Sequence, residues 1–113
     1  MSEGINNAGA VTGFYFGGVG PHGFIRDGRG GITSFDPPGS TFTVALSINN
    51  AGAVTRYYSD GFAFHGFIRD GRGRFTSFDP PGSVFTQSLS INNAGAVTGN
   101  YLGGPGIHGF VRP

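Results

Sequence analysis

The chain has 113 residues, of which 23 are Gly, seven are Pro and none is Cys or Trp. A formal net charge of +1 gives no basic surface of the kind that binds nucleic acid, and the absence of Cys excludes disulfides and thiolate metal sites. No apolar segment is long enough to span a membrane, and the first residues do not form a signal peptide. With 12 Phe and four Tyr among its apolar residues, the composition indicates a folded, Gly-rich β-chain and not a disordered one.

A 43-residue repeat dominates the sequence. The segment Ile-Asn-Asn-Ala-Gly-Ala-Val-Thr begins at Ile5, Ile48 and Ile91, and residues 5–47 are identical to residues 48–90 at 31 of 43 positions. The third copy ends after 23 positions. Repeats of this length are typical of solenoids, arrays and propellers.

Each copy predicts four short strands, which we name in chain order for the complete second copy: Phe42–Ile48, Ala53–Tyr58, His65–Arg69 and Phe75–Asp79. In the first of these, Phe42, Val44, Leu46 and Ile48 are expected to share one face. Asn and Gly supply the turn after this strand, Asp70-Gly71-Arg72-Gly73 is a hairpin signal, and Pro80-Pro81-Gly82 ends the fourth strand.

Four strands in about 43 residues are typical of one β-propeller blade, although a β-sandwich also fits short strands with regular turns. We therefore expect an all-β, single repeat domain over residues 1–113. Its blades cover about residues 1–40, 41–83 and 84–113, the last of them without its outer strand. Three blades cannot close a ring, so homo-oligomerisation into a six-bladed dimer is predicted, with a five-bladed dimer as the alternative.

The motifs also resemble a known family. Ile-Asn-Asn-Ala-Gly-Ala-Val-Thr-Gly, followed by His-Gly-Phe and then Thr-x-Phe-Asp-x-Pro-Gly, is similar to the bacterial extracellular repeats named for their His-Ala-Phe motif. The resemblance implies a propeller-like fold and an extracellular setting, and it implies no activity. Since the chain is short and has no export signal, a fragment or a designed or reconstructed repeat protein is suggested.

Charged, aromatic and His side chains recur at equivalent positions and are the candidate ligand-binding residues: Arg26, Arg69, Arg112, His22, His65, His108, Tyr15, Tyr58, Tyr101, Asp36 and Asp79. One interpretation is structural, with His packed between blades and Arg–Asp pairs holding the blades. The other is a set of repeated carbohydrate sites, in which the charges bind hydroxyls and Tyr stacks on the sugar ring.

The remaining motifs indicate structure more than chemistry. The Asn pairs at 6–7, 49–50 and 92–93 are interpreted as turn formers. The variable loops cover residues 16–21, 59–64 and 102–107, and Phe62 and Phe64 either anchor a partner or cover a blade edge.

Near-identical copies do not supply the asymmetric set of groups that catalysis needs, so we expect no enzyme, metal or cofactor. The predicted function is a self-assembling scaffold whose partner is a second copy of itself. The alternative is a multivalent, lectin-like module that binds glycans.

Overall fold

The computed structural model describes residues 2–18, 20–80, 82–104 and 106–113. These residues form eleven β-strands and no helix, which confirms the prediction of an all-β fold. The described residues therefore include no helix that could cross a membrane. The strands are β1 (Ser2–Ile5), β2 (Val11–Gly17), β3 (Gly20–Arg26), β4 (Ile32–Phe35), β5 (Phe42–Ile48), β6 (Val54–Ser59), β7 (Phe64–Arg69), β8 (Phe75–Phe78), β9 (Phe85–Ile91), β10 (Val97–Gly103) and β11 (Gly106–Arg112).

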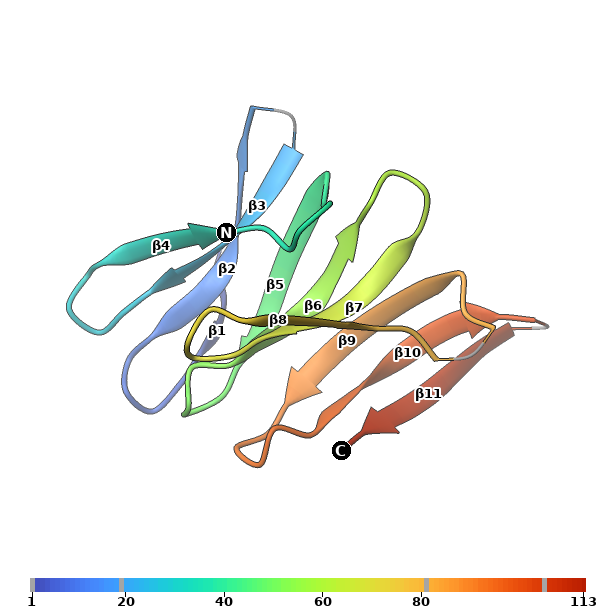
Figure 1. Cartoon of the computed structure of the whole chain (residues 1–113). Coiled ribbons are helices and arrows are strands. Elements are labelled where there is room, and N and C mark those ends of the chain that lie inside the picture. Colours follow the sequence, from blue (N-terminus) through green and yellow to red (C-terminus); the bar gives the residue numbers. More distant parts are fainter. Residues whose placement is uncertain (1, 19, 81, 105) are drawn as a thin grey trace.

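The strands are grouped in three antiparallel meanders, which fan out from left to right in Figure 1. The first meander is a four-stranded sheet in the order β1-β2-β3-β4. The second contains β5 to β8 and the third β9 to β11, and within each meander every strand pairs with the next one in the chain. A single parallel pairing, between Phe64 and Phe85, joins the second and third meanders into one curled sheet.

Turn chemistry accounts for where the strands begin and end. The strand β5 has the predicted bounds, β7 and β8 differ from the prediction by one residue at one end, and β6 is shifted by one residue at both ends. Between β5 and β6, the Oδ1 atom of Asn49 accepts the N–H groups of Ala51 at 3.0 Å and Ala53 at 2.9 Å, and Gly52 has a φ of +83°. Pro81, which the sequence analysis places in the turn after the fourth strand, and Val19 and Pro105 in the variable loops lie outside the described residues.

A β-bulge in the first strand of each meander changes which side chains face the core. In β5 the pairing with β6 shifts its register at Leu46, and the register also shifts in the pairings of β1 and β9. The prediction that Phe42, Val44, Leu46 and Ile48 share a face is therefore wrong for Ile48, because the extra residue of the bulge, Leu46, reverses the alternation. Ile48 lies on the opposite face with Ala45, and both are buried.

Successive meanders pack face to face in the same manner. The strand β5 lies against β1, β2 and β3, and β9 lies against β5, β6 and β7. We call the face of a meander that is turned toward the preceding meander its leading face, and the opposite one its trailing face. Two hydrophobic clusters fill the two junctions. The first contains Phe35 from the first meander with Ala45, Ile48, Val54, Tyr58 and Phe67 from the second. The second contains Ala53, Ile91 and Val97, with Ile68, Phe78 and Phe110 packed against them.

Candidate functional site

Each meander carries a His on its third strand, paired across the sheet with a Tyr on the second strand. The ring centroids are 5.4 Å apart for Tyr15 and His22, 5.3 Å for Tyr58 and His65, and 5.1 Å for Tyr101 and His108. In the first two meanders the Tyr hydroxyl also makes a hydrogen bond to a Ser on the fourth strand, at 2.9 Å and 2.6 Å. The structure therefore brings the predicted His and Tyr residues together, as a stripe on each leading face.

The predicted Asp residues join this stripe through the His rings. The Nδ1 atom of His22 is 2.8 Å from Oδ2 of Asp36, and Nδ1 of His65 is 2.6 Å from Oδ2 of Asp79. The other oxygen of Asp79 accepts a hydrogen bond of 2.8 Å from the hydroxyl of Thr86, which belongs to β9. The chain of contacts from His65 through Asp79 to Thr86 thus links the second meander to the third.

His65 also contacts a second carboxylate, which the sequence did not predict. The Nε2 atom of His65 is 2.9 Å from Oδ2 of Asp60, whereas Nε2 of His22 contacts the carbonyl of Gly17 at 2.9 Å. Asp60 lies in the variable loop of the second copy and has no counterpart in the other copies, so the repeat gave no signal for it. Its spacing of five residues before His65, at the start of a tight turn, was the available clue.

Electrostatics favour a charged imidazole at these positions. The hydrogen bond to Asp36 raises the pKa of His22 above its ordinary value. Burial lowers the pKa of His65, but the hydrogen bonds to Asp60 and Asp79 outweigh it, and the net pKa is raised. The hydrogen bond from His65, helped by the N–H groups of the following turn, lowers the pKa of Asp60 to about 2. Both ring nitrogens of His65 are engaged by carboxylates, an arrangement that suits a structural link.

The predicted Arg–Asp pairs do not form among the described residues. The guanidinium of Arg69 instead lies over the ring of Phe35 at 5.1 Å, and that of Arg112 lies over Phe78 at 5.3 Å. In both cases the Arg is on the leading face of one meander and the Phe is on the preceding meander. His22 and His65 contact the Asp carboxylates instead, and Arg69 and Arg112 make cation–π contacts across the junctions.

The two loop Phe residues behave differently. The ring of Phe64 is 4.7 Å from that of Phe85 and 5.5 Å from that of Tyr57, so Phe64 is part of the aromatic contact between the second and third meanders. Phe62, at the tip of the loop, is 97% exposed. The interpretation that these residues cover a blade edge therefore applies to Phe64 and not to Phe62.

The Asn pairs form turns and also connect the meanders. The Nδ2 group of Asn6 donates to the carbonyl of Asn49 at 3.0 Å, and Nδ2 of Asn49 donates to the carbonyl of Asn92 at 2.9 Å. Beside this line, the N–H of Asn7 donates to Oδ1 of Asn50, and the N–H of Asn50 donates to Oδ1 of Asn93, both at 2.9 Å. We call these four hydrogen bonds the Asn ladder. The sequence predicts the turns, but it does not predict the hydrogen bonds between successive Asn pairs.

The outer faces of the first and third meanders expose side chains that are covered at equivalent positions elsewhere. Ile5 is 70% exposed, whereas Ile48 and Ile91, which occupy the same position in the next two copies, are each 7% exposed. We define the head face as the leading face of the first meander, with Ile5, Tyr15 and Ile32 exposed on it. The tail face is the trailing face of the third meander, with Leu102, Ile107 and Val111 exposed on it.

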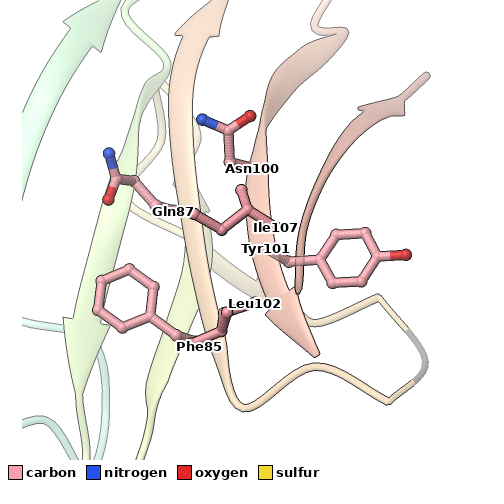
Figure 2. A pocket seen from close by; sticks show the side chains of 6 residues that line it. All are labelled: Phe85, Gln87, Asn100, Tyr101, Leu102 and Ile107. Carbon is pink, nitrogen blue, oxygen red and sulfur yellow. The ribbon is translucent and has the colours of Figure 1, made fainter. Parts of the chain in front are cut away.

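The tail face is hollowed by an open groove of about 280 Å³, lined by Phe85, Gln87, Asn100, Tyr101, Leu102 and Ile107. Figure 2 shows Phe85 and Gln87 on β9 beside Leu102 and Asn100 on β10, with the ring of Tyr101 directed away from them. The equivalent face of the second meander carries Tyr57 and Phe64, and there the ring of Phe85 from the next meander covers them. The groove is therefore the place where a following meander would pack.

No three His, Cys, Asp or Glu side chains of the described chain are arranged to hold a metal ion. No family model, no curated protein and no solved structure matches the sequence. The resemblance to the His-Ala-Phe repeats, like the assignment of the recurring His, Arg, Tyr and Asp residues to ligand binding, stays a prediction.

Proposed function

We propose that this chain is a non-enzymatic, self-assembling repeat scaffold, in which each meander is a propeller blade and two copies close a ring of six blades. One observation carries the proposal: positions that are buried or partly buried at the internal junctions, such as Ile48 and Ile68, are exposed where they recur as Ile5 on the head face and Val111 on the tail face. The contrast between Ile5 at 70% exposure and its equivalents at 7% is the sharpest case.

The energetic argument follows from this contrast. Covering one Ile or Leu side chain contributes about 1.5–3 kcal/mol, and several such side chains are exposed at each end. Open apolar faces of this kind promote uncontrolled association. A closed ring covers both faces of every copy and leaves none free, so assembly stops at a defined size.

The test is the solution mass measured by light scattering after size exclusion, over a wide range of dilution. We expect a species of twice 11.7 kDa that dissociates on dilution. Replacing Ile5 with Glu or Val111 with Glu should weaken the dimer at least tenfold, because each change places a charge in the covered face. Phe62→Glu is the matched control, since Phe62 is as exposed but lies at a loop tip. A single-chain mass at every concentration would reject the proposal.

The second candidate is multivalent carbohydrate binding, which the regular Tyr–His pairs with centroid distances of 5.1–5.4 Å support. Tyr15 is 39% exposed and lies beside His22, whose ring contacts Asp36, so the first meander offers the most open copy of this set. A glycan array tests it. Binding should fall on Tyr15→Ala and persist on Phe62→Ala, and an array without any positive glycan would reject this candidate.

A further inference from the structure

The Asn ladder has a direction. At each internal junction, the side chain and the main chain of the earlier Asn pair donate, and the later Asn pair accepts. The carbonyl of Asn49 shows the full pattern, because it accepts both the Nδ2 group of Asn6 at 3.0 Å and the N–H of Gly52 at 3.1 Å. The middle Asn pair, Asn49-Asn50, is therefore a donor to the next copy and an acceptor from the previous one.

The two ends of the ladder carry opposite unused groups. Within the described part of the chain, Nδ2 of Asn92 and the N–H of Asn93 have no acceptor, although Oδ1 of each accepts hydrogen bonds. At the other end, Oδ1 of Asn7 has no donor among the described residues, and the carbonyl of Asn6 accepts from them only the N–H of Gly9, at 3.1 Å. The tail end offers two donors, and the head end offers two acceptors at the corresponding positions.

We propose that the head face of one copy docks on the tail face of a second copy, with the Asn ladder continued across the seam. Nδ2 of Asn92 donates to the carbonyl of Asn6 in the second copy, and the N–H of Asn93 donates to Oδ1 of Asn7 in the second copy. This inference rests on the proposed self-assembly and specifies its partner, direction and register. Two heads would place acceptors against acceptors, and two tails would place donors against donors, so like ends do not fit.

The apolar side chains agree with this direction. At the internal junctions, Ile25 packs on the cluster that contains Ile48, and Ile68 packs on the cluster that contains Ile91. Val111 is the counterpart of Ile25 and Ile68 on the tail face and is 73% exposed. In the head-to-tail seam, Ile5 of one copy meets Val111 of the other. This contact repeats the internal ones, in which Ile48 lies in the cluster with Ile25 and Ile91 in the cluster with Ile68.

The ladder is tested by two substitutions that are chemically the same. Asn7→Ala removes the side-chain amide with its Oδ1 acceptor at the head and keeps the internal bond of Asn7, which uses the backbone N–H. Asn93→Ala removes the acceptor of an internal bond from Asn50 but leaves the backbone donor at the tail. We expect Asn7→Ala to weaken association about fivefold for each seam while the denaturation midpoint of dilute, monomeric protein is unchanged. Asn93→Ala should lower that midpoint and leave association nearly unchanged for protein that remains folded.

An isosteric substitution gives a second test at the tail. Asn92→Asp keeps the Oδ1 atom that accepts the N–H groups of Ala94 and Ala96, so the turn is retained. The change replaces the Nδ2 donor with a carboxylate oxygen, which would face the carbonyl of Asn6. Association should weaken by more than the fivefold expected for Asn7→Ala. If Asn7→Ala and Asn92→Asp both associate like the unaltered protein while that protein dimerises, the ladder inference fails and the proposed function stands.

The direction of docking is tested by mixing Ile5→Glu and Val111→Glu. Each variant alone should stay largely monomeric, because every seam pairs its altered face with an unaltered one. In an equimolar mixture, a dimer made of one copy of each variant has one seam in which both faces are unaltered. Native mass spectrometry should therefore find these mixed dimers. If like ends met, either variant alone would still dimerise through its unaltered end, and the inference would be rejected. If the unaltered protein itself is monomeric, the proposed function and this inference fail together.

Discussion

Gly66 lies directly beneath the ring of Phe78: a Cβ atom built on Gly66 would be 2.6 Å from the ring. The two residues are cross-strand partners in β7 and β8, so the close approach is set by the sheet itself. Gly23 has the same relationship to Phe35, its partner in the first meander. The fourth strand of each of these two meanders therefore explains why Gly follows His in the repeat.

Replacing Gly66 with Ala should destabilise the protein by about 1–3 kcal/mol, because the ring of Phe78 must move out of a packed junction. Gly109, the equivalent residue of the third meander, has only a backbone oxygen near its Cβ position, at 3.9 Å. Gly109→Ala should therefore be neutral or stabilise by about 0.5 kcal/mol, through the smaller entropy of the unfolded chain. Urea denaturation of the two variants measures the difference, and equal losses would show that the Phe78 ring is not the cause.

The cation–π contact of Arg69 with Phe35 predicts a similar contrast between equivalent residues. Arg69→Gln should lower the free energy of unfolding by about 0.5–1 kcal/mol, since the guanidinium leaves the ring at the junction of the first two meanders. Arg26 is the matched control, because no aromatic ring of the described chain lies beneath its guanidinium. Thermal and urea denaturation of dilute protein should find Arg26→Gln close to the unaltered chain. A loss at Arg26 as large as that at Arg69 would contradict the assignment.

The strands could be predicted from the sequence because their signals are local. β5 alternates apolar and small residues between turn formers, and it occupies the predicted range Phe42–Ile48. Which face of the sheet each side chain occupies was harder to predict, because the bulge at Leu46 reverses the alternation and no Gly or Pro marks it in the sequence. A one-residue shift moved Ile48 to the other face, where it became part of the junction with the first meander.

The repeated polar residues show the same limit. Oδ1 of Asn49 forms the turn that its sequence context predicts, but the role of Nδ2 depends on a carbonyl 43 residues away. The choice between Arg and His as the partner of Asp79 likewise depends on tertiary packing. The sequence offers both residue types as partners, and only the folded structure shows that His65 contacts Asp79 while Arg69 extends toward Phe35 of the preceding meander.

Stability should depend on pH through His65 and Asp60. A His whose pKa is raised on folding stabilises the folded state fully below its unfolded pKa of 6.5, and this contribution is lost as the pH rises through the folded pKa. Asp60, with its pKa lowered to about 2, stabilises above its unfolded value of 3.8 and loses this contribution as the pH falls. The denaturation midpoint should therefore be highest between about pH 4 and pH 6.5 and should decline above that range.

The His65→Asn variant separates this contribution from the rest. It should be less stable than the unaltered chain at pH 5.5 and show a smaller decline toward pH 9, with the residual decline due to His22, whose pKa Asp36 also raises. The double variant with His22→Asn should show little decline. All midpoints are compared at one protein concentration, because association shifts apparent stability by mass action. A decline that persists in full in the double variant would mean that groups other than these His–Asp links control the pH dependence.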